Sequence, residues 1–278
     1  MLADARVIRE DHPGCGVEKI YHTLAPPWIG RDKCCQLLLK SGFRLKKHVN
    51  RCKTTNSVKS RYQNLIEGML LTNKNQLWQS DITYFETGGR WFYLVFIIDA
   101  YTKVIVGYSA SENLKANSNI AALKMAFKSQ GITALNNLIH HSDYGSQYHQ
   151  NEYIEMLNQK SILISMGRKG QENAYAERIN GTIKNEYLKS KSPRTLNELK
   201  RVLKNKVDHY NNKRIHKSLP NKRTPKQFEN ELLNLTTQKR PKVIVYTDGK
   251  PNLKAALSRI EVYPEKDLQA PVCPMVYN

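Results

Sequence analysis

Acidic residues are scarce in this chain, as are cysteines and long apolar runs. The 278 residues contain 24 Asp and Glu against 44 Lys and Arg, which gives a formal net charge of +20. Such a charge favours polyanionic partners, meaning nucleic acid or an anionic membrane surface. A merely solvated basic surface is the alternative, although ordinary surfaces mix charges of both signs.

The lack of a long apolar segment argues against the membrane. The longest apolar run, Trp91 to Ile98, ends at Asp99 and is far shorter than a membrane span. Charged residues interrupt the first eleven positions, so we expect no signal peptide. The five cysteines are odd in number and lack the spacing of a disulfide framework, which favours a reducing compartment. We therefore expect a cytoplasmic protein that meets nucleic acid.

The basic residues are unevenly distributed. From Lys33 to Ile66 there are nine Lys or Arg and no acid, and from Tyr187 to Lys226 there are thirteen against two acids. Residues 46–75 are polar and basic, and we interpret them as a linker that lies on DNA. The side chains expected to contact the DNA backbone there, with an affinity that falls as salt rises, are Lys46, Lys47, Arg51 and Lys53.

The first 45 residues carry a helix-turn-helix pattern. Val17, Ile20, Tyr21 and Leu24 follow the spacing of one helical face, and Pro26-Pro27 ends that helix. A second helix is expected from Arg31 to Ser41, with Gly42 ending it in the left-handed conformation. Its expected buried residues are Cys34, Leu37 and Leu38.

Residues 76–230 predict an α/β domain. Three strands with short connections (77–85, 91–98 and 104–108) indicate an antiparallel meander, and alternating helices and strands follow as far as a long helix at 173–188. This order predicts an RNase H-like mixed five-stranded sheet with flanking helices. Residues 231–278 are expected to be a C-terminal extension, with short strands at 241–263 that would form a small β-unit.

Three acidic residues stand out by their placement. Asp81 lies inside the first strand among aromatic residues, where an ionised carboxylate is costly unless something pairs with it. Asp143 ends the fourth strand, at the sheet edge where α/β proteins place ligands. Glu177 lies on the long helix and shares a face with Lys184, away from that helix's apolar side. Carboxylate oxygens suit Mg²⁺, and two such ions stabilise phosphodiester transfer.

Five segments carry a family resemblance. They are His12 to Leu24, Trp78 to Tyr84, His141 to Tyr148, Asn173 to Lys184, and Tyr210 to Leu219 followed by Thr224-Pro225. In this order they resemble the insertion-sequence transposases of the IS-three family, specifically the product of its second reading frame. The resemblance covers roughly residues 10 to 230.

The resemblance implies an RNase H-like catalytic domain of the retroviral-integrase type. It implies that Asp81, Asp143 and Glu177 bind Mg²⁺, with Mn²⁺ as a substitute, and that Lys184 contacts DNA. Cleavage at element ends, strand transfer by the freed 3′-hydroxyl, and a homo-oligomer on double-stranded DNA are also implied, in a bacterial cytoplasm at the nucleoid. Arg168 and Lys169, just before the catalytic helix, are further candidate DNA contacts.

Two departures leave alternatives open. Thirty-three residues separate Asp143 from Glu177, two fewer than the family's usual spacing, which would also fit a decayed copy that binds DNA without cutting it. Glu172 is the alternative third acid. The chain begins without the long N-terminal region of a complete recombinase, so an upstream-frame protein or fusion is an expected partner. A plain RNase H-like nuclease is the third alternative, and the helix-turn-helix argues against it.

Some residues invite a role that the pattern does not support. Asp99 is expected to fix the turn after the second strand, and His140 to pack in the core. His141 is a candidate to orient Asp143 or touch phosphate. His12, His22, Cys34 and Cys35 have the wrong spacing for a zinc site, because the two cysteines are adjacent.

Overall fold

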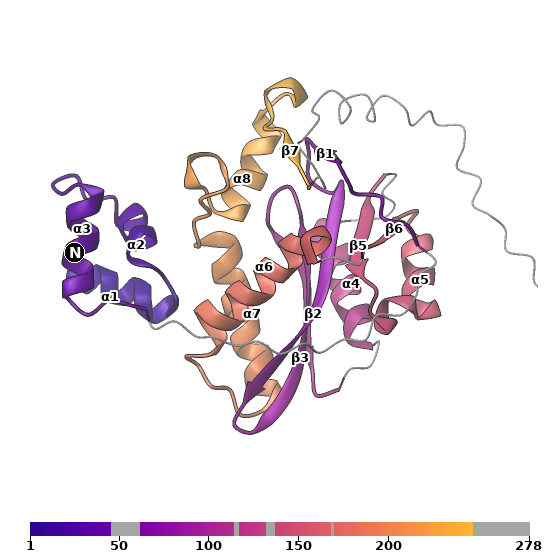
Figure 1. Cartoon of the computed structure of the whole chain (residues 1–278), viewed down its shortest axis with the longest axis horizontal. Coiled ribbons are helices and arrows are strands. Elements are labelled where there is room, and N and C mark those ends of the chain that lie inside the picture. Colours follow the sequence, from indigo (N-terminus) through magenta and orange to yellow (C-terminus); the bar gives the residue numbers. More distant parts are fainter. Residues whose placement is uncertain (46–61, 114–116, 132–136, 168–169, 247–278) are drawn as a thin grey trace, which may run out of the picture.

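The computed structural model describes residues 1–45, 62–113, 117–131, 137–167 and 170–246 (Figure 1). The expected strand at 259–263 lies outside these ranges, and so do the predicted DNA contacts Lys46, Lys47, Arg51, Lys53, Arg168 and Lys169. Among the residues described, no helix combines the length and apolar character that crossing a membrane requires.

An N-terminal module, defined here as residues 1–45, consists of three short helices at one end of the molecule (Figure 1). The sequence predicted the second and third, which form the helix-turn-helix. The first was not predicted, because it is polar and buries only Ala5 completely. The helices are α1 (Leu2–Asp11), α2 (Val17–Leu24) and α3 (Arg31–Lys40).

The small core of the module corrects one detail of the prediction. Ile20, Cys34 and Leu38 are buried in it, as expected. Leu37 is 39% exposed, so its expected burial is wrong. Cys34 and Leu38 are four residues apart and share a helical face, whereas Leu37 points away from that face. Gly42 ends the unit with a φ of +88°, the left-handed conformation predicted for it.

A five-stranded mixed sheet forms the centre of the molecule. Its strand order is β4-β3-β2-β5-β6, with β2, β3 and β4 antiparallel and with β5 and β6 running parallel to β2. This topology confirms the RNase H-like class. The strands are β2 (Leu77–Thr87), β3 (Arg90–Asp99), β4 (Ile105–Ser111), β5 (Ile139–Asp143) and β6 (Leu163–Gly167).

Helices cover both faces of this sheet (Figure 1). Val95 and Ile97 of β3 pack with α4 and α5 on one face, whereas Leu94 and Phe96 pack with α6 and α7 on the other. Burial on both sides makes β3 an almost uninterrupted apolar run. The helices are α4 (Asn117–Gln130), α5 (Asn151–Asn158), α6 (Ala174–Thr182), a π-helical continuation of α6 (Ile183–Leu188) and α7 (Leu196–Asn212).

A third apolar cluster closes the sheet end beside α8 (Pro225–Glu231). There β1 (Leu70–Leu71) pairs antiparallel with β7 (Val243–Ile244), joining a segment that precedes the five-stranded sheet to one that follows α8. The predicted domain boundaries stay predictions. Short 3₁₀ turns complete the described chain at Ser146–His149, Gly170–Asn173, Pro220–Lys222, Leu232–Asn234 and Thr237–Lys239.

Candidate active site

Asp81 and Asp143 lie at matching positions on adjacent strands. Ser80 of β2 pairs with Ser142 of β5 in the parallel register, and each aspartate is the next residue along its strand. Asp81 Oδ2 accepts a hydrogen bond from Asn180 Nδ2 at 2.6 Å, and its Oδ1 accepts one from the Ile82 amide. Two carboxylates are therefore held side by side at one sheet edge.

The electrostatics of Asp81 differ from those of an ordinary aspartate. Burial, followed by the negative charge of Asp143 and that of Glu177, raises the pKa of Asp81 to about 8. Burial also raises the pKa of Asp143, against a hydrogen bond from the Gly145 amide. Within the part of the chain that the structure describes, the raised pKa values of both aspartates indicate that their negative charge is incompletely compensated.

Glu177 joins these two aspartates from the first turns of α6. The buried face of the helix is apolar, with Ala176 and Ile179 on the sheet, and this turns Glu177 towards the aspartates. Partial desolvation and then the charge of Asp143 raise its pKa. The three acids predicted from the sequence are therefore brought within electrostatic range of one another.

Lys184 reaches the same region from the π-helical segment. Its Nζ donates a hydrogen bond to the Tyr84 carbonyl at 3.3 Å, beside Asp81 on β2. Burial lowers the pKa of Lys184, and the charge of Asp81 acts in the opposite direction. A cation therefore lies at the edge of the acidic cluster, as the shared helical face predicted.

The chemistry of the cluster fits a hard divalent cation. All of its donors are carboxylate oxygens, and a cation would relieve their mutual repulsion. Within the described ranges, no three His, Cys, Asp or Glu side chains already converge on one point. Asp81 accepts hydrogen bonds from Asn180 and from the Ile82 amide, which leaves acceptor positions on its carboxylate for an ion.

The alternative third acid, Glu172, lies beside Gly167, the residue of β6 that pairs with Asp143 of β5. It is buried near Gly167 and His141, and Tyr246 Oη donates to its Oε1 at 3.4 Å. The charges that raise the pKa of Asp81 are those of Asp143 and Glu177, which favours Glu177 as the third acid. His141 is fully buried and hydrogen-bonds Ser165 at 2.8 Å, so the role expected for it beside Asp143 is not borne out.

Two other expectations are confirmed. Asp99 fixes the turn after β3, because its Oδ1 accepts hydrogen bonds from the Tyr101 amide and from the amide and hydroxyl of Thr102. His140 packs in the core, where it bonds the Tyr153 hydroxyl at 2.9 Å.

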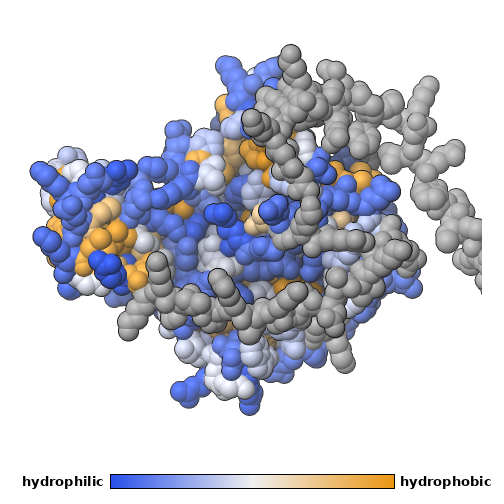
Figure 2. All heavy atoms as spheres, in the orientation of Figure 1, coloured by the Kyte–Doolittle hydropathy of each residue, from blue (hydrophilic) through white to orange (hydrophobic). Residues whose placement is uncertain are grey.

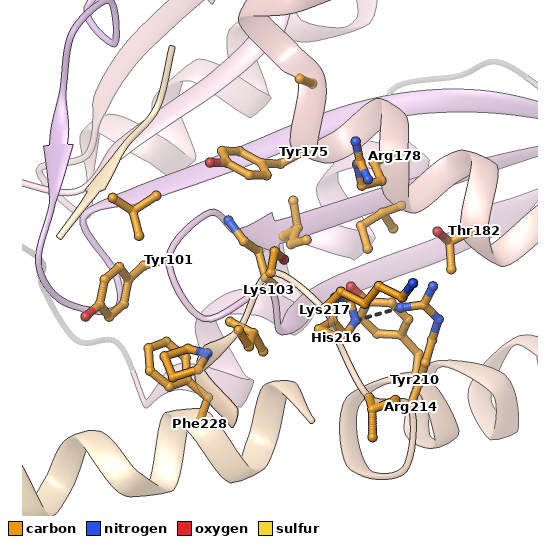
Figure 3. A pocket seen from close by; sticks show the side chains of 18 of the residues that line it. Tyr101, Lys103, Tyr175, Arg178, Thr182, Tyr210, Arg214, His216, Lys217 and Phe228 are labelled. Carbon is orange, nitrogen blue, oxygen red and sulfur yellow. Dashed lines mark hydrogen bonds between the residues drawn. The ribbon is translucent and has the colours of Figure 1, made fainter. Parts of the chain in front are cut away.

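A cavity of about 960 Å³ lies on the other side of α6 (Figure 3). Lys103, with its Nζ 3.4 Å from the centroid of the Tyr175 ring, lies on one side of it, and Arg214 and His216 lie on another. Arg178 also lines it and makes no hydrogen bond or ion pair within the part of the chain described. The visible face around these elements is mainly hydrophilic (Figure 2). This cavity is basic, whereas the site around Asp81 is acidic.

Sequence reasoning missed two residues that bear on the site. Asn180 holds Asp81, and Glu186 joins the catalytic helix to the N-terminal module. Asn180 is three residues after Glu177, a spacing that places both near one helical face and was an available signal. Nothing local marks Glu186, because its partners are distant in the sequence.

Comparison with known proteins places this architecture in a family. Models of the Integrase core domain match residues 72–172 and 158–225. The uncharacterized 31 kDa protein of insertion element IS600 from Shigella sonnei is 36% identical over 203 residues, which are 69% of this chain and 72% of that protein. The transposase for insertion sequence element IS629, from the same species, is 31% identical over 216 residues, 76% and 72% of the two chains.

The transposase InsF for insertion sequence IS3A of Escherichia coli K12 is 31% identical over 175 residues, 62% of this chain and 60% of that protein. Among solved structures, the HTLV-2 integrase catalytic core domain in complex with magnesium superposes with a TM-score of 0.45 and 19% identity. It covers 60% of this chain and 99% of that one. The chain belongs to the insertion-sequence transposases that carry an integrase core domain, as its resemblance to the IS-three family predicted. It is an enzyme of the transposase and integrase class, a polynucleotidyl transferase.

Proposed function

We propose that this transposase cuts DNA at the ends of its insertion element and joins the freed 3′-hydroxyl to target DNA. The observation that carries the proposal is the cluster of Asp81, Asp143 and Glu177, whose pKa values are all raised. Uncompensated carboxylates at a sheet edge serve no packing purpose and suit metal-dependent phosphodiester chemistry.

In this proposal the three carboxylates are the metal ligands. Two Mg²⁺ ions, for which Mn²⁺ substitutes, would stabilise charge on the attacking and leaving oxygens. Asn180 would orient the Asp81 carboxylate by its hydrogen bond. Lys184 lies beside Asp81 and holds a DNA phosphate near the reacting bond.

Double-stranded DNA is the proposed substrate, bound by the helix-turn-helix and by the basic surface. Lys46, Lys47, Arg51, Lys53, Arg168 and Lys169 stay predicted contacts, and the structure adds Arg178 as a candidate. Pairing two element ends requires at least a homodimer on DNA. The upstream-frame partner and the location at the bacterial nucleoid, in the cytoplasm, stay predictions from the resemblance.

The competing function is that of a decayed copy, which binds DNA without cutting it. The short interval between Asp143 and Glu177 motivates it. The interval ends in the 3₁₀ turn Gly170–Asn173, directly before α6. Glu177 nevertheless lies within electrostatic range of Asp143, which favours an active enzyme.

The test is a cleavage and joining assay with purified protein, Mg²⁺ or Mn²⁺, and DNA that carries the flanking element ends. Wild-type protein is expected to give nicked and joined strands. Asp143→Asn and Glu177→Gln should each reduce both products by about a thousandfold or more, while DNA binding stays largely intact. Activity that survives either change would show that the acid is wrongly assigned. Binding without any cleavage by the wild type would favour the decayed copy, or a chain that needs its upstream partner.

A further inference from the structure

The most buried polar contacts between the N-terminal module and the rest of the described chain meet at one side chain, Glu186, whereas the contacts of Lys217 with Glu18 and of Lys222 with His22 are exposed. It lies in the π-helical segment that continues α6, two residues after Lys184. His12 and Lys19 reach it from the module, and Arg214 reaches it from the loop after α7. Three parts of the chain that are distant in sequence therefore share one carboxylate, which we call the Glu186 clamp.

The geometry of the clamp is close to complete for a carboxylate. His12 Nε2 lies 2.6 Å from Oε2, Lys19 Nζ lies 3.0 Å from Oε1, and Arg214 bonds both oxygens in a fork, at 2.9 and 3.0 Å. Because a carboxylate only accepts, the Nε2 of His12 carries the proton. The side chain of His12 is 3% exposed and that of Arg214 is 9% exposed, so water competes little for these bonds.

The backbone fits equally closely at the same point. The Gly14 amide donates to the Glu186 carbonyl at 2.7 Å. A Cβ at position 14 would lie 2.3 Å from the Glu186 Cα, so only glycine allows this approach. The His12 ring also stacks on Tyr187, with centroids 4.4 Å apart and planes 9° apart. The module is therefore seated directly on the backbone of the helical segment.

That segment continues the helix that carries Glu177. Glu186 is nine positions after Glu177, which in an ideal α-helix corresponds to about 13 Å along the axis and to roughly opposite faces. In Figure 1 the module lies on the far side of α6 from β5, the strand that carries Asp143. Any shift of the module relative to α6 is therefore a shift relative to the cluster of acids.

The Arg214 side of the clamp is itself held in place. His216 bonds Arg214 Nη1 at 3.0 Å and packs edge-on against the Tyr210 ring (Figure 3). Asn211, in the last turn of α7, fixes the start of this loop to β4, because its side chain both accepts from and donates to the Ile105 backbone. These residues belong to the segment Tyr210 to Leu219, one of the five segments that carry the family resemblance. They connect the sheet to the clamp.

We propose that the Glu186 clamp sets the distance between the DNA sequence held by the helix-turn-helix and the phosphodiester cut at the acids. Glu186 is a positioning residue, and it is held by its contacts with His12, Gly14, Lys19 and Arg214. The inference rests on the proposed cleavage activity. It goes beyond that activity, because it states which contacts determine where the cut falls.

Weakening the contacts of the Glu186 clamp should increase the number of positions at which each DNA end is cut. Full-length wild type, Glu186→Gln and Gly14→Ala are each incubated with Mn²⁺ and element-end DNA, and the cut positions are mapped to the nucleotide. The wild type is expected to cut each end at one position, and both variants at several neighbouring positions. Gly14→Ala leaves every charge in place, and its added Cβ forces the N-terminal module away from Glu186. If Glu186→Gln fails to fold, Gly14→Ala decides the question alone.

The matched control is Glu229→Gln. Glu229 is also a buried carboxylate paired with two cations, Lys74 and Lys226, but it does not touch the module. Its variant should cut at the wild-type position, even if it melts earlier. A single sharp cut from both clamp variants overturns the proposal, because a purely structural clamp would change yield and not position.

Hydrogen exchange on the same proteins without DNA gives a readout that needs no activity. The amides of residues 12–19 and 183–188 should exchange about tenfold faster in both clamp variants, with β3 unchanged. Unchanged exchange at those amides also overturns the proposal. If the wild type does not cut but the clamp variants exchange faster, the proposed cleavage chemistry is wrong. The conclusion that Glu186 holds the N-terminal module against the helix is then still supported.

Discussion

One continuous helix carries two glutamates in opposite surroundings. Glu177 faces other carboxylates, and partial desolvation and the charge of Asp143 raise its pKa. Burial acts on Glu186 in the same direction, but hydrogen bonds from His12 and Arg214 and the charges of Arg214 and Lys19 outweigh it. Its pKa lies well below the ordinary value. Residue type and helix are the same, so the difference comes entirely from the neighbours.

The comparison separates a reactive carboxylate from an architectural one. A carboxylate that is fully supplied with donors has no capacity left for a metal ion, and it fixes the parts that supply those donors. A carboxylate among like charges has unused capacity and is stabilised by a cation. The surroundings of the two glutamates therefore differ in the way that the two proposals require, with Glu186 joining the N-terminal module to the helix and Glu177 binding metal.

The largest expected effect that tests this contrast is on stability without metal. Glu186→Gln should lower the free energy of unfolding by about 3 kcal/mol, because it leaves Lys19 and Arg214 buried without their anion. Glu177→Gln should leave stability unchanged or raise it, because it removes a repelling charge. Urea denaturation of the two variants and the wild type measures this. Equal losses from both would mean that the two sites do not differ as described.

A smaller effect is expected from pH. The folded-state pKa of Asp81 is raised to about 8 from 3.8, so the folded protein keeps a proton that the unfolded chain releases. Stability from this group therefore falls as pH rises from about 4 to 8. The pKa values of His12 and Glu186 are lowered instead. These two groups therefore stabilise the folded state fully above their ordinary pKa values of 6.5 and 4.5, and this stabilisation is lost as the pH falls.

Melting temperatures between pH 5 and 8, with and without Mg²⁺, measure both trends. Mg²⁺ should raise the wild-type melting temperature by a few degrees at pH 8 and by less at pH 5, since it binds ionised carboxylates. Asp81→Asn should abolish most of that gain in melting temperature. Glu186→Gln should reduce the fall in melting temperature that acidification causes. A Mg²⁺ effect that is independent of pH and of Asp81 would contradict the metal assignment.

The smallest expected effect concerns the basic cavity beside the clamp. If Arg178 contacts one DNA phosphate, Arg178→Ala should reduce the slope of log affinity against log salt by about 0.9. Lys124→Ala is the control, because Lys124 is exposed on α4, across the sheet from the cavity. Fluorescence anisotropy over a salt series measures the slopes. Identical slopes for both variants and the wild type would remove Arg178 from the proposed DNA surface.

Local patterns carried most of the prediction. The strands around Asp81 and Asp143 and the helix of Glu177 lie where their apolar spacing indicated, and Lys184 lies within electrostatic range of Asp81. The prediction was incomplete or wrong where the pattern was weak. The polar helix α1 was not predicted, and Leu37 is exposed although its residue type suggested burial.

The sequence by itself determined the class of fold and the basic character and predicted the three acids, because each depends on residue type and on spacing within a short segment. Only the tertiary structure decided which carboxylate is compensated. His12 and Glu186 are 174 positions apart, and their contact exists only because α1, the end of α6 and the loop after α7 pack together. Burial and neighbouring charge shift a pKa, and both arise when distant segments meet.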